Sequence, residues 1–208
     1  PELMYSMPKG LTAATGMDAL THAIESYITP GAWVMSDMFE LKAIEMIAQN
    51  LKAAVDNGKD VAAREAMSQA QYIAGMGFSN VGLGIVHSMA HPLGAFYDTP
   101  HGVANALLLP YVMEYNAESP AAPKYIHIAK AMGVDTTGMS EAEGVKAAVE
   151  AVKALSASIN IPQKLHEINV KEEDIPALAV AAFNDVCTGG NPRPTSVADI
   201  EALYRKAF

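Results

Sequence analysis

Residues 12–27 read TAATGMDALTHAIESY, and this stretch indicates the fold most directly. Its apolar side chains recur every three or four positions, which is typical of the buried face of an α-helix. These side chains are Ala14, Met17, Leu20, Ala23, Ile24 and Tyr27. The turn Thr29-Pro30-Gly31 follows at once, and proline and glycine commonly end helices. Residues 12–27 therefore predict an amphipathic helix.

Helical periodicity continues through the rest of the chain. We expect further helices over residues 37–55, 61–75, 103–115, 121–132, 140–156, 175–185 and 196–208. Asp37 with Glu40, and Ser196 with Asp199, are spaced as capping pairs that open two of these helices. Pro110 is expected to bend or end its helix, because proline has no backbone N–H to donate.

Two glycine-rich passages interrupt the helical pattern. We interpret residues 75–84 as a loop or a tightly packed segment before a helix that contains His87. Two GxG pairs within this passage begin a dinucleotide-binding motif, but Asn80 and His87 stand where the motif needs its third glycine. The second passage, TGGNPR at residues 188–193, predicts a turn in a solvent-facing loop.

The fold class that follows is all-α. Alternating strand patterns and internal repeats are not found, and alanine and methionine are abundant. The sequence therefore predicts one helical, bundle-like domain over residues 1–208. A mixed α/β domain is the alternative, because short apolar runs such as residues 106–109 fit a strand equally well.

Composition limits the classes of partner. The chain has 208 residues, half of them apolar, which is enough to bury the core of one domain. Its formal net charge is −9 and its lysines are scattered, which argues against nucleic acid. No apolar run reaches the ~18 residues of a membrane span, and no basic and apolar leader opens the sequence. The single cysteine, Cys187, is typical of a reducing compartment. We therefore expect a cytoplasmic protein that acts on a small molecule, with neither nucleic acid nor a membrane as partner.

Candidate metal ligands lie in three short motifs that hold four of the six histidines. The motifs are DALTH from Asp18 to His22, HSMAHP from His87 to Pro92, and HG at His101. Neutral imidazole is the commonest protein ligand of transition metals, and a carboxylate with two or three imidazoles suits Fe(II) or Zn(II). We therefore predict a metal site here, and we interpret His127 and His166 as surface residues.

Taken singly, the motifs have simpler interpretations. Asp18 and His22 are four residues apart, so on a helix they can form an ordinary surface contact. His101 can be an exposed turn residue, although a helix N-terminus would keep its imidazole neutral. It is the occurrence of all three motifs in one chain that favours a metal.

The second motif also resembles the paired histidines of a zinc-protease helix. That interpretation fails because Ser88 stands where such an enzyme needs its general-base glutamate. Pro92 is expected to move His91 away from helical dihedral angles, so the imidazoles of His87 and His91 need not meet at one metal.

Four stretches together carry a family resemblance over essentially all 208 residues. GLTAATGMDALTHAIESY at residues 10–27 resembles a signature of the iron-containing alcohol dehydrogenases. GLGIVHSMAHPLGA at residues 82–95 and HGVANA at residues 101–106 are similar to the second signature of that family. DVCTGGNPR at residues 185–193 is similar to its lactaldehyde reductase branch.

The resemblance implies roles for individual residues. Asp18, His22, His87 and His101 correspond to the ligands of a catalytic Fe(II), or of Zn(II) in some members. His91 corresponds to a catalytic histidine beside the nicotinamide cofactor and the substrate, outside the ligand set. Phe78 and Cys187 correspond to positions that line the substrate pocket; for Cys187 a small buried apolar residue is the alternative.

The resemblance also implies an activity and a nucleotide-binding domain that lies outside this sequence. Family members use NAD(P) and a metal that acts as a Lewis acid during hydride transfer between small alcohols and aldehydes. They begin with an α/β nucleotide-binding domain, which this chain lacks, and the full-length protein is a possible homodimer. We therefore expect the C-terminal helical domain alone, with little or no turnover by itself. The alternatives are a helical metal-dependent hydrolase, although the usual His-Asp dipeptide is missing, and a non-catalytic metal-binding fragment.

Overall fold

The computed structural model describes residues 1–208, which form nine α-helices, five short 3₁₀ helices and no strand. The α-helices are α1 (Lys9–Ile28), α2 (Val34–Asp56), α3 (Val61–Val81), α4 (Ile85–Tyr97), α5 (His101–Asn116), α6 (Tyr125–Ala131), α7 (Glu141–Ser158), α8 (Ile175–Phe183) and α9 (Val197–Ala207). The 3₁₀ helices are η1 (Glu2–Met4), η2 (Ala122–Lys124), η3 (Leu165–Ile168), η4 (Glu172–Asp174) and η5 (Val186–Gly190). The predicted all-α fold class is confirmed.

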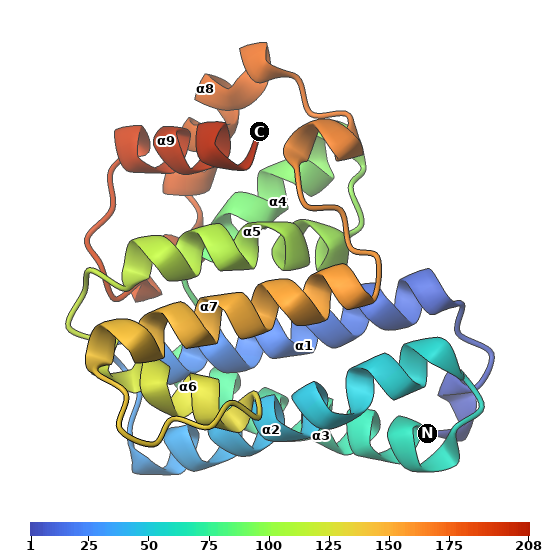
Figure 1. Cartoon of the computed structure of the whole chain (residues 1–208). Helices are drawn as coiled ribbons and strands as arrows, with labels where there is room; N and C mark the ends of the chain where they lie inside the picture. Colours follow the sequence, from blue (N-terminus) through green and yellow to red (C-terminus); the bar gives the residue numbers. More distant parts are fainter.

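Helix α1 is the central element of the bundle. It packs against α2 and α3 on one side and against α5 on another, and α4, α8 and α9 lie beyond α5 (Figure 1). Most of its residues are buried, including polar ones such as Thr21, Glu25 and Ser26. A single apolar cluster of 49 buried residues runs through these helices, so the chain has one continuous core. No helix is both long and apolar enough to cross a bilayer.

One of the two predicted capping pairs is wrong. Helix α2 begins at Val34, where Trp33 and Ser36 form the capping arrangement, so Asp37 and Glu40 are not a capping pair. The Asp37 carboxylate instead accepts a hydrogen bond of 2.9 Å from the Lys124 ammonium. Such tertiary contacts of a carboxylate cannot be read from its spacing along the chain. The second predicted pair, Ser196 with Asp199, does cap α9.

Two further local expectations are wrong, and Pro110 does not end its helix. Helix α3 runs through Gly75 and Gly77 to Val81, which leaves only residues 82–84 as a loop. Pro110 and Pro92 both lie inside helices that continue past them. Both prolines are buried, and the packing of α4 and α5 against their neighbours outweighs the cost of a lost backbone hydrogen bond.

A close approach of two backbones places the start of α5 on α1. A Cβ atom on Gly102 would lie 2.4 Å from the carbonyl oxygen of Ala14, so only glycine fits there. Ala14 lies one helical turn before Asp18, and His101 is the first residue of α5. The contact therefore brings His101 and Asp18 to the same level of the bundle.

Glu40 is a fully buried acid where α1, α2 and α3 meet. Its Oε1 lies 2.6 Å from Ser26 Oγ, and a Cβ atom on Gly77 would collide with that oxygen. Ser26 Oγ also lies 2.5 Å from the carbonyl oxygen of His22. A serine hydroxyl has one proton, so a protonated Glu40 that donates to Ser26, with Ser26 donating to His22, satisfies both contacts. Burial, only partly opposed by the Ser26 contact, raises the pKa of Glu40 from 4.5 to about 8.

The raised pKa of buried Glu40 predicts that the stability of the fold depends on pH. Between the two pKa values the folded protein holds the Glu40 proton and the unfolded chain does not, so rising pH favours unfolding. Relative to Glu40→Gln, the free energy of unfolding of the natural chain should fall by about 1.4 kcal/mol per pH unit across this interval. Denaturant unfolding from about pH 5.5 to about pH 7.5 measures the difference. Glu45→Gln, on the exposed side of α2, is the control, and parallel curves for Glu40→Gln and the natural chain would refute the assignment.

Candidate metal centre

Asp18 and His22 lie one turn apart on α1 and face the same side. The Nδ1 atom of His22 is 2.8 Å from the backbone carbonyl of Asp18, an acceptor that requires the ring proton to be on Nδ1. This hydrogen bond leaves His22 Nε2 with a free lone pair. Metal-binding histidines commonly have their second nitrogen fixed in this way, because it sets both tautomer and ring orientation.

His87, on α4, is oriented by a buried carboxylate of α1. Its Nδ1 donates to Glu25 Oε2 over 2.6 Å, and both side chains are only 2% exposed. The other carboxylate oxygen of Glu25 accepts from the backbone amide of Val86 over 2.7 Å. His87 Nε2 is buried, lies 3.9 Å from Asp18 Oδ1 and has no hydrogen-bond partner in the protein. An unpartnered lone pair beside a carboxylate is what a cation would complete.

His101 approaches the same carboxylate from the start of α5. Its Nε2 lies 3.4 Å from Asp18 Oδ1, while its side chain is 44% exposed. The Asn105 amide, one turn further along α5, donates to Asp18 Oδ1 over 2.6 Å and contacts His101 Nε2 at 3.0 Å. Asn105 therefore connects these two side chains.

Together Asp18, His22, His87 and His101 form the histidine cluster. One ligand atom from each of Asp18, His22 and His87 lies within 4.8 Å of the others, which meets the spacing of a metal site. The ring centroids of His87 and His101 are 5.4 Å apart, so His101 borders this group. The donor set of three imidazoles and one carboxylate fits Fe(II) or Zn(II), and the unpartnered His87 Nε2 is consistent with that fit.

Burial and local charges shift the pKa values of the three histidines in different directions. Burial, together with the charge of His87, lowers the pKa of His22, and burial also lowers the pKa of His101. At His87 burial acts in the same direction, but the hydrogen bond and the charge of Glu25 outweigh it and raise the pKa. Two of the rings are therefore held neutral, as ligands must be, and the third is held in a fixed orientation.

His91 lies beside the histidine cluster rather than within it. It follows His87 by one turn of α4, its ring stacks on that of His101 with centroids 5.5 Å apart, and its side chain is 42% exposed. Its Nδ1 is 2.8 Å from Asp185 Oδ2, a contact between α4 and the start of η5. His91 thus keeps a helical position despite Pro92, contrary to expectation, and it does not belong to the group of Asp18, His22 and His87.

The two predicted pocket residues each lie beside a different histidine of this region. The ring of Phe78, on α3, lies against His22 with centroids 4.5 Å apart. Cys187 is half-buried in η5, within 4.8 Å of ligand atoms of His91 and Asp185. Burial and the charge of Asp185 raise the pKa of the Cys187 thiol to about 12. Both residues lie close to the predicted metal site; a contact with substrate remains a prediction.

Three residues were missed as site residues by sequence reasoning: Glu25, Asn105 and Asp185. Glu25 is seven positions after Asp18 on the same helix, so an acid on an otherwise apolar face was the available signal. Asn105 follows His101 by four positions. Asp185 had no usable signal, since 94 residues separate it from His91. Asn191, expected in a solvent-facing loop, is buried and exchanges hydrogen bonds with Asn116.

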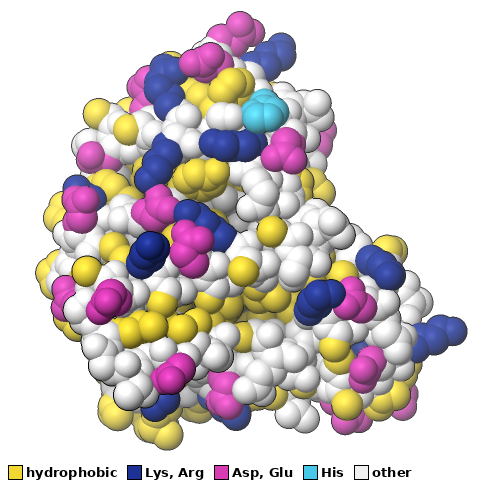
Figure 2. All heavy atoms as spheres, viewed as in Figure 1, with side chains coloured by type: hydrophobic (Ala, Val, Ile, Leu, Met, Phe, Trp, Pro, Cys, Tyr) yellow, Lys and Arg dark blue, Asp and Glu magenta, His cyan; other side chains and the backbone are white.

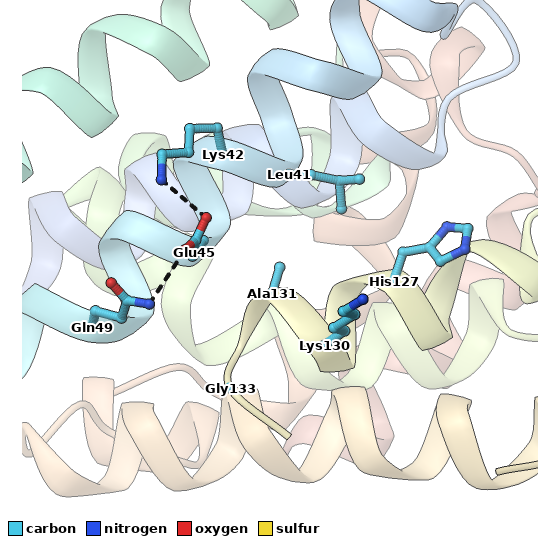
Figure 3. A pocket seen from close by; sticks show the side chains of 8 residues that line it. All are labelled: Leu41, Lys42, Glu45, Gln49, His127, Lys130, Ala131 and Gly133. Atoms are coloured by element: carbon cyan, nitrogen blue, oxygen red, sulfur yellow. Dashed lines mark hydrogen bonds and ion pairs between the residues drawn. The ribbon is translucent and has the colours of Figure 1, made fainter. Parts of the chain in front are cut away.

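One surface groove away from the histidine cluster offers no comparable chemistry. A groove of about 510 Å³ between α2 and α6 is lined by side chains that bond one another, such as Lys42, Glu45 and Gln49, and shares no residue with the histidine cluster (Figure 3). His127, on its rim, pairs with Tyr27, and His166 pairs with the backbone of Phe208. Both are exposed, which confirms them as surface residues. On the face seen in Figure 2, basic and acidic side chains are intermixed.

Comparison with known proteins identifies the family. The profile of the Fe-containing alcohol dehydrogenase family, C-terminal, matches residues 12–208. Lactaldehyde reductase of Escherichia coli K12 is 59% identical over 207 residues, which are 100% of this chain and 53% of that protein. 1,3-Propanediol dehydrogenase of Klebsiella pneumoniae is 47% identical over 208 residues, or 100% of this chain and 54% of that protein. The chain thus spans about half the length of these relatives.

Solved structures agree with the sequence match. The crystal structure of a 1,3-propanediol oxidoreductase superposes with a TM-score of 0.98 at 47% identity, covering 100% of this chain and 54% of that one. An alcohol dehydrogenase from Oenococcus oeni gives a TM-score of 0.96 at 41% identity, over 99% of this chain and 54% of that one. The chain belongs to the iron-containing alcohol dehydrogenase family and corresponds to its C-terminal domain. The resemblance read from the sequence motifs is confirmed.

The Glu25–His87 bond makes a testable prediction about metal affinity. In Glu25→Gln the side-chain oxygen can still accept from the Val86 amide. The amide nitrogen that replaces the second carboxylate oxygen cannot accept a hydrogen bond from His87 Nδ1. Loss of such an orienting partner should weaken Zn(II) binding by about 10- to 100-fold. Competition titration with a chromogenic chelator measures the change. Glu150→Gln on the exposed face of α7 is the control, and equal affinities for all three proteins would show that Glu25 does not orient a ligand.

Proposed function

We propose that this chain is the metal-binding catalytic domain of an NAD(P)-dependent alcohol dehydrogenase or aldehyde reductase of the lactaldehyde reductase kind. The observation that carries the proposal is the meeting of Asp18, His22 and His87 from two helices, with a buried, unpartnered nitrogen on His87. A relative 59% identical over the whole chain carries the name lactaldehyde reductase, which supports a small alcohol or aldehyde as substrate.

In this proposal the histidine cluster holds the metal. Asp18 supplies the carboxylate, and His22 and His87 supply nitrogens whose opposite ring atoms are already engaged. His101, at the exposed edge, is the fourth ligand. A divalent metal, Fe(II) or alternatively Zn(II), supplies Lewis acidity that draws electron density from an alcohol or carbonyl oxygen. The half-exposed side of His101 is where a substrate oxygen has access.

In this proposal His91 transfers the proton and contacts the cofactor. Its Nδ1 is engaged by Asp185, which leaves Nε2 to donate or accept a proton at the exposed edge. The imidazole stacks on His101 and so lies next to a proposed ligand without being one. Phe78 and Cys187 are assigned to the substrate pocket because they flank His22 and His91 respectively. We propose NAD(P) as the cofactor because the family uses it. A homodimer and a cytoplasmic location stay predictions from the sequence.

Metal uptake tests the ligand assignment on the chain itself. The natural chain should take up one Fe(II) when purified without oxygen and loaded with Fe(II), and His22→Ala and His87→Ala should lose this stoichiometric uptake. Elemental analysis after gel filtration gives the ratio. His166→Ala, an exposed histidine bonded only to a backbone carbonyl, is the matched control. Unchanged uptake in both ligand variants would reject the assignment.

Activity is tested in a chimera that adds the part of a relative that this chain does not cover. The preceding segment of Escherichia coli lactaldehyde reductase, joined to this chain, should reduce lactaldehyde with NADH or NADPH. His22→Ala should abolish turnover, and His91→Ala should lower kcat by about 100-fold or more, because a positioned acid or base contributes that much. A metal-loaded chimera without turnover would leave the non-catalytic fragment as the correct description. Hydrolysis of a phosphodiester by the metal-loaded chain would favour the hydrolase alternative, which no observation supports.

A further inference from the structure

A second group of metal-type donors lies outside the histidine cluster. His91, Asp185 and Cys187 offer a nitrogen, an oxygen and a sulfur atom that all lie within 4.8 Å of one another. They come from two elements far apart in sequence, since His91 lies on α4 and the other two residues lie at the start of η5. The tertiary fold rather than a local motif therefore brings the three together.

The arrangement is fixed by hydrogen bonds on the protein side. Asp185 Oδ2 lies 2.8 Å from His91 Nδ1, and Asp185 Oδ1 accepts from the backbone amide of Cys187 over 2.9 Å. Although burial opposes it, these hydrogen bonds keep the pKa of Asp185 below its usual value, so the carboxylate is ionised at neutral pH. Thr188 Oγ1 donates to the Ala182 carbonyl and lies 2.8 Å from Ser88 Oγ, which holds η5 against α4 and α8.

Access and donor chemistry favour a particular class of cation. The His91 side chain is 42% exposed and that of Asp185 is 18% exposed, so an ion can enter from solvent. A thiolate, an imidazole and a carboxylate together select Zn(II) and similar thiophilic ions over Mg(II) or Ca(II), which prefer oxygen alone. Three protein ligands leave a position for water.

We propose that His91, Asp185 and Cys187 form a second, solvent-accessible site for a thiophilic divalent cation such as Zn(II) or Cd(II), separate from the histidine cluster. On binding, the Cys187 S–H bond breaks, a sulfur–metal bond forms, and the proton passes to the buffer. The single ring proton of neutral His91 moves through solvent from Nδ1 to Nε2, His91 binds through Nδ1, and the cation takes the place of the hydrogen between His91 and Asp185. Where the proposed function holds, this ion withdraws His91 from proton transfer and is therefore inhibitory.

The single cysteine makes the site directly observable. A thiolate–Cd(II) charge-transfer absorption in the ultraviolet can come only from Cys187, because the chain has no other sulfur of that type. Titration with Cd(II) should reach two ions per chain, one of which carries the absorption. Cys187→Ser should remove the absorption and one ion, and His91→Ala and Asp185→Asn should weaken the absorbing site at least about 10-fold, the scale on which single ligand-shell changes act. His166→Ala is the matched histidine control, and circular dichroism checks that each variant is folded.

The outcomes separate this proposal from the function proposed above. His22→Ala with His87→Ala should retain one ion with full absorption, since these residues do not belong to the second site. One ion without absorption in the natural chain would overturn the second site and leave the histidine cluster intact. One ion with absorption would support the second site and reject the cluster. Absorption that persists unchanged in both His91→Ala and Asp185→Asn would show a lone reactive cysteine and also overturn the proposal.

Discussion

The buried hydrogen bond between Glu25 and His87 is the constraint on which the rest of the site depends. Both side chains are almost fully removed from solvent, where a carboxylate is unfavourable unless it is paired and hydrogen-bonded. Glu25 meets this requirement with one oxygen on the His87 ring and the other on the Val86 amide. The pairing fixes which face of α4 turns toward α1, and it leaves His87 Nε2 facing Asp18.

The polar interior differs on the two sides of α1. Toward α2, hydrogen bonds link Glu40 to Ser26 and Ser26 to the His22 carbonyl. These hydrogen bonds hold α1 against α2. Toward α4 and α5, His87 Nε2 and Asn105 Oδ1 are buried without a protein partner. Unpaired buried polar atoms cost about 1–3 kcal/mol each. Glu40 Oε2 is unpaired as well, but only His87 Nε2 and Asn105 Oδ1 belong to side chains that lie beside Asp18, where a bound cation could use them. The same helix therefore carries a rigid support on one side and a binding arrangement on the other.

The site opens on one edge only. His22 and His87 are enclosed, whereas His91 and His101 stack on each other and are about half exposed. Asp185 extends this edge to η5 and with it to Cys187. The enclosed rings suit the holding of a metal, and the exposed rings suit contact with molecules that come and go. This division of roles follows from depth in the bundle, because all four rings have similar chemistry.

The sequence by itself determined the helical class and the approximate extent of most helices, and through the family resemblance it predicted Asp18, His22, His87 and His101 as a ligand set. The helical class depends on periodicity, which is local, whereas the ligand set spans three helices and depends on motifs shared with the family. Only the tertiary structure decided that α3 continues through its glycines, that Pro92 and Pro110 stay inside helices, and that Glu40 is buried. It also decided the partners Glu25, Asn105 and Asp185, because each meets its histidine or carboxylate through the packing of helices. Packing energy is a property of pairs of elements, and no single stretch of sequence records it.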